Sequence, residues 1–159
     1  MFIMDKLKMS NSRFDTVTWS TDSLMSLHEK YRIKYYERPT FETILSEQQR
    51  YEYSEIIENM LIRLPMPHIY LLENNDGDYE VIRGREKMVA LYMCMENLLE
   101  FTGLRYYPEE NGQHFTQLPK QLQRRISEYN WSIVILRLQM ENENAIDAID
   151  RIKRIVRLN

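Results

Sequence analysis

One segment near the middle of the chain constrains the fold most, because two strand patterns joined by a tight turn run directly into a helix pattern. Residues 68–72 and 78–82 have the composition of strands, and Asn74-Asn75-Asp76-Gly77 between them is typical of a hairpin turn. Gly84 ends the second strand, and a helix is expected to open at Arg85. That helix is expected to place five apolar residues on one face: Met88, Leu91, Tyr92, Met95 and Leu98. The segment therefore predicts a fold that combines a sheet with helices.

Further patterns on either side of this segment complete the expected fold. A helix is expected to begin at Ser54, a residue type favoured at the N-cap, and to end before Pro65. In residues 131–136, apolar side chains occur at both odd and even positions, which predicts a central strand covered on both faces. Residues 101–107 are expected to form a short strand, and Pro119 fits the first turn of another helix. Together these patterns predict a helix-rich α/β (α+β) fold, in which helices flank a small mixed sheet.

The two ends of the chain carry less regular patterns. Residues 1–44 are expected to form an N-terminal arm and a short helix, and residues 45–159 the main domain. The last helix of that domain is expected at about residues 141–158. A short strand or an ordered arm would suit the apolar residues near the start, which are Phe14, Val17 and Trp19.

Composition limits the functions that the chain as a whole can support. Lys and Arg number 21 and Asp and Glu number 24, so the net charge is 21 − 24 = −3 and nucleic acid is not attracted globally. Any such binding needs a local basic patch. The single cysteine permits no internal disulfide and suits a reducing compartment. The apolar residues 1–4 are too short for a signal sequence or a membrane span, so a cytoplasmic protein without a membrane partner is expected.

The junction between the hairpin and the helix is the region best suited to binding a ligand. Gly84 lets the backbone approach a ligand closely, and the first free N–H groups of a helix attract anions. Arg83, Arg85 and Lys87 surround this point, so a phosphate of a nucleotide or of a nucleic acid would suit it. The alternative is an ordinary tight turn with solvated charges, because one glycine and three cations are not a specific motif.

Several short motifs stand in the order and spacing of a known family. Gln49-Arg50-Tyr51 precedes IIENMLIRLPMPHIYL at residues 56–71, and DGDYEVIRGREK follows at residues 76–87. FTQLP at residues 115–119 and IVRLN at residues 155–159 complete the series. This series resembles the N-terminal domain of GmrSD-type restriction enzymes, which reads "QR…W", "LI-x-SIL-x-G-x-PIPPI", "DG-x-Y-x-V-x-DGQQR", "F-x-x-LP" and "IF-x-RLN". That family is related to ParB and sulfiredoxin.

The resemblance implies a ParB/sulfiredoxin-like α/β fold that handles nucleotides or DNA. In the family, the "DGQQR" segment is the proposed site where a nucleoside triphosphate with magnesium is bound and hydrolysed, in support of the cleavage of modified phage DNA. Arg83, Gly84, Arg85 and Lys87 would then hold a phosphate. Gln49-Arg50 would approach the same site from the start of the preceding helix. A nuclease module of the His-Asn-His type, or a partner protein, would lie outside this chain.

The chain departs from the family motif in ways that bear on catalysis. Arg83 stands at the family's acidic position, Arg85 and Glu86 stand at its two glutamines, and Lys87 stands at its arginine, so Gly84 alone is kept. The lost carboxylate would have been a general base or a metal ligand, so the change favours holding an anion over hydrolysing one. Glu86 is the remaining candidate for a catalytic residue. The junction also resembles the "GERR" segment of ParB, which binds a cytidine nucleotide and DNA.

Two questions stay open at the level of the sequence. A catalytically dead regulatory or protein-interaction module is the alternative to a nucleotide- or DNA-binding domain. The family continues after "RLN", so the chain is expected to be either a trimmed N-terminal domain or a short stand-alone relative.

No residues show metal-ligand spacing, so no metal site is expected. Two basic clusters suit either a solvated face or a nucleic-acid contact: Arg124-Arg125, and the set Arg151, Lys153, Arg154 and Arg157.

Overall fold

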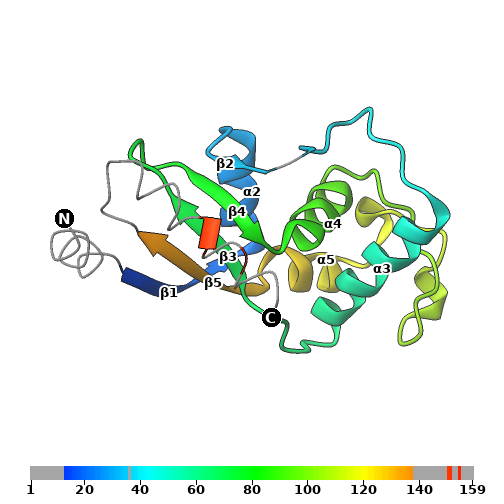
Figure 1. The fold of residues 1–159 in the computed structure, drawn as a ribbon. Helices are drawn as coiled ribbons and strands as arrows, with labels where there is room; N and C mark the ends of the chain where they lie inside the picture. Colours follow the sequence, from blue (N-terminus) through cyan, green and yellow to red (C-terminus); the bar gives the residue numbers. More distant parts are fainter. Residues whose placement is uncertain (1–12, 36, 138–149, 152–153, 155–159) are drawn as a thin grey trace, which may run out of the picture.

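The computed structural model describes residues 13–35, 37–137, 150, 151 and 154. Within these residues the sheet has five strands, in the order β1-β5-β3-β4-β2 (Figure 1). Their bounds are Arg13–Ser20 for β1, Ile33–Lys34 for β2, Ile69–Glu73 for β3, Tyr79–Arg83 for β4 and Asn130–Arg137 for β5. The β1–β5 and β3–β4 pairs are antiparallel, and the β3–β5 and β2–β4 pairs are parallel. The sheet is therefore mixed, as the sequence predicts.

Four α-helices accompany the sheet in the described part of the chain. They are α2 (Thr21–Glu29), α3 (Glu47–Leu61), α4 (Arg85–Met95) and α5 (Lys120–Ser127). In Figure 1, α3, α4 and α5 lie together beside the sheet, on the side away from β1. The expected α/β (α+β) fold, with helices next to a small mixed sheet, is confirmed.

The hairpin that organises the fold has the expected turn. Asn74 Oδ1 accepts the backbone N–H groups of Asp76 and Asp78, each at 3.0 Å. Gly77 lies at φ +81°, which glycine adopts without strain. The helix after the hairpin begins at Arg85, as predicted. The helix expected near Pro119 begins at Lys120, so Pro119 is its N-cap and not part of its first turn.

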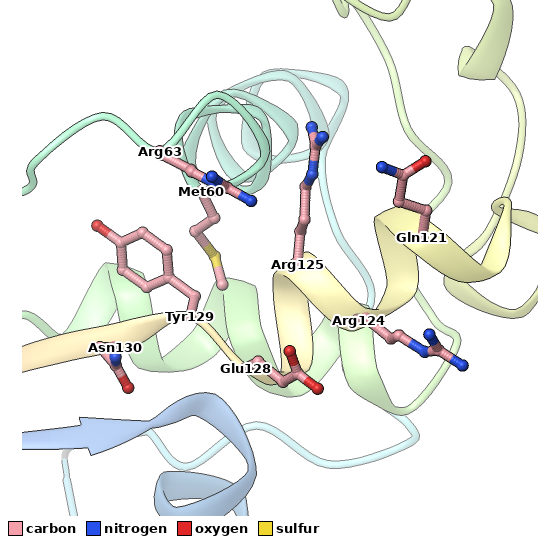
Figure 2. A pocket seen from close by; sticks show the side chains of 8 residues that line it. All are labelled: Met60, Arg63, Gln121, Arg124, Arg125, Glu128, Tyr129 and Asn130. Atoms are coloured by element: carbon pink, nitrogen blue, oxygen red, sulfur yellow. The ribbon is translucent and has the colours of Figure 1, made fainter.

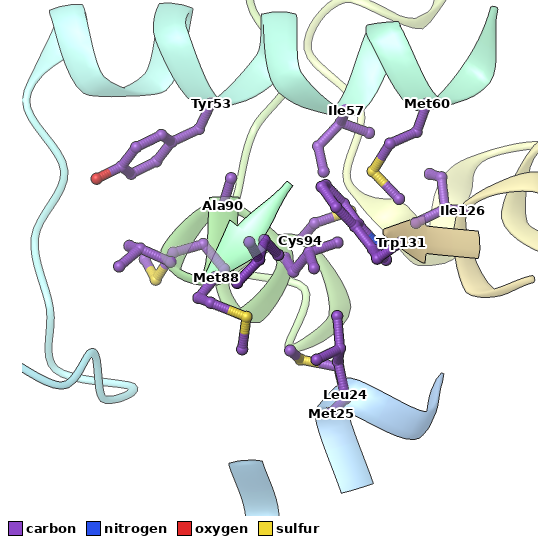
Figure 3. Close-up of a cluster of buried hydrophobic side chains, with 14 of the residues drawn as sticks. Leu24, Met25, Tyr53, Ile57, Met60, Met88, Ala90, Cys94, Ile126 and Trp131 are labelled. Atoms are coloured by element: carbon purple, nitrogen blue, oxygen red, sulfur yellow. The ribbon is translucent and has the colours of Figure 1, made fainter. Parts of the chain in front are cut away.

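The main hydrophobic core surrounds α4. Figure 3 shows side chains of α3 on one side of this helix and side chains of α2 on the other. The buried residues of α4 are Met88, Val89, Ala90, Leu91, Met93 and Cys94, which cover most of its circumference. The five residues expected on one face are therefore only part of the apolar surface near this helix, and Leu98 lies beyond its end at Met95. Because α2 and α3 both pack on α4, the helix has little surface left for solvent.

β5 is covered on both faces, as its sequence predicts. Trp131, Ile133 and Ile135 belong to the main core, and the indole Nε1–H of Trp131 donates to the hydroxyl of Thr21 at 3.0 Å. Successive side chains of a strand alternate between faces, so the opposite face carries a second buried cluster. That cluster consists of Leu72, Ile82, Val134 and Leu136.

β1 and β2, which precede residue 45, belong to the same sheet as β3, β4 and β5. β1 pairs with β5 along its full length, from Ser20 opposite Asn130 to Arg13 opposite Arg137. The expected boundary at residue 45 therefore does not interrupt the sheet, and the segment expected to be a strand or an arm is a strand. The helix expected at 141–158 lies outside the described residues except at positions 150, 151 and 154, which are helical.

α3 begins earlier than its apolar pattern indicates. Ser46 is the N-cap: its Oγ accepts the N–H of Gln49 at 3.1 Å, and Gln49 Oε1 accepts the N–H of Ser46 at 2.9 Å. This capping box precedes Ser54, so the prediction of Ser54 as the N-cap is wrong. Ser54 is buried within α3 instead, where its Oγ accepts the N–H of Thr102 at 3.0 Å. The end of α3 at Leu61, before Pro65, agrees with the prediction.

The strand expected at residues 101–107 is absent, and a loop occupies this part of the described chain. The buried carboxylate of Glu58 accepts three backbone N–H groups of this loop. The donors are Arg105 at 3.0 Å, Tyr106 at 2.9 Å and Tyr107 at 3.3 Å. Because a side chain of α3 satisfies these groups, the segment needs no neighbouring strand.

Candidate functional site

The junction between β4 and α4 contains a glycine that both the backbone conformation and the packing require. Gly84 is the N-cap of α4 and lies at φ +104°. A Cβ atom at this position would lie 3.0 Å from Ile69 Cγ1 and 3.3 Å from Ile69 Cα, on the neighbouring strand. Gly84 also provides no side chain to cap α4. The junction is therefore tight, and the positive end of the helix dipole carries no side-chain cap.

A cavity of about 310 Å³ lies beside this helix end. Its walls come from the loop at residues 37–45, from Gln49 and Tyr53 of α3, and from Arg85 and Val89 of α4. Two of the residues predicted for the phosphate site, Gln49 and Arg85, therefore face the same cavity although they belong to different helices. We call this space the α4 cavity.

The guanidinium of Arg85 is held at the α4 cavity by oxygen atoms on two sides. Its Nη2 donates to the backbone oxygen of Glu37 at 2.8 Å and lies 3.9 Å from the Glu37 carboxylate. Its Nη1 lies 3.7 Å from the Glu86 carboxylate. Gln49 uses its side-chain oxygen in the capping box of α3. The cation at this site is thus fixed in place and partly neutralised.

Glu86, the candidate for a catalytic residue, links α3 to α4. Burial raises the pKa of Tyr53 to about 12, and the charge of Glu86 and its hydrogen bond with Tyr53 act in the same direction. The carboxylate of Glu86 therefore accepts from Tyr53 and pairs with Arg85. A carboxylate with these two partners is suited to positioning the helices relative to each other.

The other residues predicted for the phosphate site are not among those that line the α4 cavity. Burial lowers the pKa of Lys87, and the nearby charge of Arg83 lowers it further, so these two cations are neighbours. Arg50 lies 3.9 Å from the carboxylate of Glu100, and its buried Nε has no hydrogen-bond partner among the described residues. In the part of the chain that the structure describes, Gln49 and Arg85 are thus the predicted residues that line the cavity.

A larger cavity, of about 480 Å³, lies where α3 and α5 end and β5 begins (Figure 2). We call it the arginine cleft, and its lining residues are Met60, Arg63, Gln121, Arg124, Arg125, Glu128, Tyr129 and Asn130. The sequence shows Arg124-Arg125 as a basic cluster, but Arg63 lies in another segment. The two segments are distant in the sequence, so no local pattern joins them.

Comparisons of the chain with protein-family models, with curated proteins and with solved structures found no match. The likeness to the GmrSD-type domain therefore stays a prediction from the sequence.

Of the basic residues predicted near the end of the chain, Arg151 and Arg154 are exposed and helical. Lys153 and Arg157 lie outside the described residues. Within the described ranges, no helix has the length and apolar composition needed to cross a bilayer.

The side chains at the α4 cavity do not fit a magnesium ion. Mg²⁺ is held by carboxylate and other oxygen ligands in near-octahedral geometry. The carboxylates beside the cavity, Glu37 and Glu86, both pair with Arg85. Across the described ranges, no group of three or more His, Cys, Asp or Glu residues is arranged to hold a metal. We therefore derive no catalytic step through a metal ion.

Proposed function

We propose that this chain binds a phosphate-bearing ligand, a nucleotide or DNA, at the α4 cavity and does not hydrolyse it. One observation carries the proposal. Gln49 and Arg85, which the family resemblance assigns to a nucleotide site, line a single cavity at the start of α4.

The local electrostatics support an anionic ligand at this position. The N-terminal end of a helix carries roughly half a positive charge, and its N–H groups point toward the ligand. Arg85 adds a planar guanidinium, which pairs with two phosphate oxygens at once. A bound phosphate would replace the Glu37 and Glu86 carboxylates as partners of Arg85, and these contacts are long enough to exchange.

The same residues favour binding over hydrolysis. Arg83 occupies the position where the resemblance places an acid, and a cation there cannot act as a general base. Glu86 is engaged with Tyr53 and Arg85. Burial raises the pKa of the Cys94 thiol, so the one cysteine is an inert part of the core. A protein that needs no disulfide suits the reducing cytoplasm, where nucleotides are available.

The proposal is tested by calorimetric titration with each of the four ribonucleoside triphosphates, with and without magnesium, together with an assay for released phosphate. Arg85→Ala is expected to weaken binding about tenfold or more, because a charged hydrogen-bonding partner of the phosphate is lost. Arg32→Ala is the matched control, since Arg32 is also ion-paired and partly exposed but belongs to the hairpin end of the sheet. Failure of every triphosphate and of a short DNA strand to bind, or equal effects of the two substitutions, would overturn the proposal.

One observation favours the alternative of a protein-interaction module. Large apolar side chains are exposed between α2 and α3, namely Tyr31 at 71%, Phe41 at 76% and Ile44 at 91%. Exposed apolar residues gathered on one segment are typical of a docking surface. The same titration, repeated with a short DNA strand, separates the two functions: a folded protein that binds no nucleotide and no DNA favours the module.

A further inference from the structure

The arginine cleft brings together more positive than negative charge. Three guanidiniums line it, from Arg63, Arg124 and Arg125, against the single carboxylate of Glu128 (Figure 2). Within the described residues, none of these arginines is part of an ion pair closer than 4.0 Å. Cations at this density without close carboxylate partners are a local exception in a chain whose net charge is −3.

Arg125 is fixed at the inner wall of the cleft. Its Nη1 donates to the hydroxyl of Tyr107 at 2.9 Å and to the backbone oxygen of Leu61, at the end of α3, at 3.4 Å. Its Nε is buried and makes no hydrogen bond to a described residue. The Tyr129 hydroxyl donates to the backbone oxygen of Leu64 at 3.0 Å, which fixes the opposite wall. The cleft is thus preorganised by contacts between α3, α5 and the start of β5.

Arg63 and Arg124 stand exposed at the rim of the cleft. The C-terminal ends of α3 and α5 carry partial negative charge, which favours arginines nearby and explains part of the cluster. That effect accounts for Arg125, which bonds to a helix-end oxygen. The side chains of Arg63 and Arg124 make no such bond to any residue that the structure describes, so their donors remain available to a ligand.

We propose that the arginine cleft binds phosphate groups of a nucleic-acid backbone, as a site separate from the α4 cavity. Guanidinium forks match phosphate oxygens, and the amides of Gln121 and Asn130 add neutral donors of the kind that contact phosphate and sugar. The cavity volume suits one nucleotide unit. Because both rim arginines are exposed, a strand can continue past the cleft in either direction.

The test uses fluorescence anisotropy of a labelled single-stranded DNA of roughly 12 nucleotides. The full chain is titrated at salt concentrations from about 50 to 200 mM. The variant combines Arg63→Asn with Arg124→Ala. Asparagine tolerates the left-handed backbone of residue 63, at φ +59°, and alanine favours the helix at residue 124. The control combines Lys30→Ala with Lys34→Ala, which removes the same charge from exposed positions elsewhere.

The rim variant is expected to bind the strand about tenfold or more weakly than the wild type. Each lost phosphate contact also reduces the slope of log K against log salt by about 0.7, so the slope should fall by about 1.4. The control should stay within about twofold of the wild type in affinity and keep its slope. Thermal unfolding of both variants confirms that they are folded.

Three outcomes would overturn the proposal. These are no binding of the strand by the wild type at the lowest salt, equal losses in the rim variant and the control, and displacement of the strand by a polyglutamate peptide as readily as by unlabelled DNA. A mononucleotide titration of the rim variant distinguishes this site from the α4 cavity. Loss of mononucleotide binding in Arg85→Ala alone, with strand binding kept, supports two independent sites.

Discussion

At the scale of single residues, Glu58 shows how one buried charge can replace a missing element of secondary structure. Its carboxylate accepts three consecutive backbone N–H groups from residues 105–107, which lie 47 to 49 positions away in the sequence. Hydrogen bonds to an ionised group are stronger than neutral ones, and buried N–H groups left without an acceptor are costly. Glu58 therefore fixes the loop that covers α3.

Replacing Glu58 with alanine is expected to lower the free energy of unfolding by at least about 2 kcal/mol, because three N–H groups lose their acceptor. Urea unfolding of the two proteins measures the difference. Glu55→Ala is the control, because Glu55 is an exposed glutamate of the same helix. Equal losses in both variants would show that the loop does not depend on the Glu58 carboxylate.

His28 is a second residue whose environment has a measurable effect, here on the pKa of its side chain. It is buried, its Nδ1 lies 2.8 Å from the Tyr35 hydroxyl, and its ring packs against Tyr92 with centroids 4.8 Å apart. Burial lowers the pKa of His28 to about 4, and the positive charge of Arg38 acts in the same direction. The folded protein therefore keeps this imidazole neutral well below the pH at which a free histidine takes up a proton.

The pH dependence of stability follows from this shift. Between pH 6.5 and about 4 the unfolded chain binds a proton at His28 that the folded chain does not. The free energy of unfolding should therefore fall as the pH drops through this window, by up to about 1.4 kcal/mol for each pH unit. His28→Gln should remove this contribution. Urea unfolding near pH 7 and pH 5 tests it, and parallel declines in the two proteins would contradict the assignment.

At the scale of elements, the junction between β4 and α4 depends on close approach of the backbone to β3. Gly84 leaves no room for a Cβ beside Ile69 and has a positive φ. Gly112 also has a positive φ, of +87°, but an added Cβ there would meet nothing within 4 Å. Comparing a substitution at Gly112 with one at Gly84 therefore separates the free-energy cost of the backbone conformation from the cost of crowding.

Gly112→Ala is expected to cost about 1 kcal/mol, the penalty of a left-handed alanine. Gly84→Ala should cost this amount plus about 1–3 kcal/mol for overpacking against Ile69. The melting temperatures and urea midpoints of the two variants provide the measurement. If Gly84→Ala were no worse than Gly112→Ala, β3 would not press on the junction as described.

Elements with strong local signals are the ones that the sequence predicts well. The turn at 74–77, the start of α4 at Arg85 and the two-sided burial of β5 all depend on neighbouring residues. The loop at 101–107 and the arginine cleft depend on distant ones, since Arg125 contacts Leu61 across 64 residues of sequence. No local pattern joins Gln49 to Arg85; the order of the family motifs alone assigned both residues to one site. Their role at the α4 cavity stays a prediction.

At the scale of the whole molecule, the first described strand forms one edge of the sheet and pairs with the last described strand. β1 finds its pairing partner in β5, and the Trp131 indole reaches Thr21 across 110 residues of sequence. On the ribosome, β1 therefore emerges long before the strand that it needs, and the main-chain groups along it stay open to other extended segments in the meantime. Bringing together ends so far apart is slow. The first described strand to be synthesised is thus among the last to be incorporated into the folded sheet.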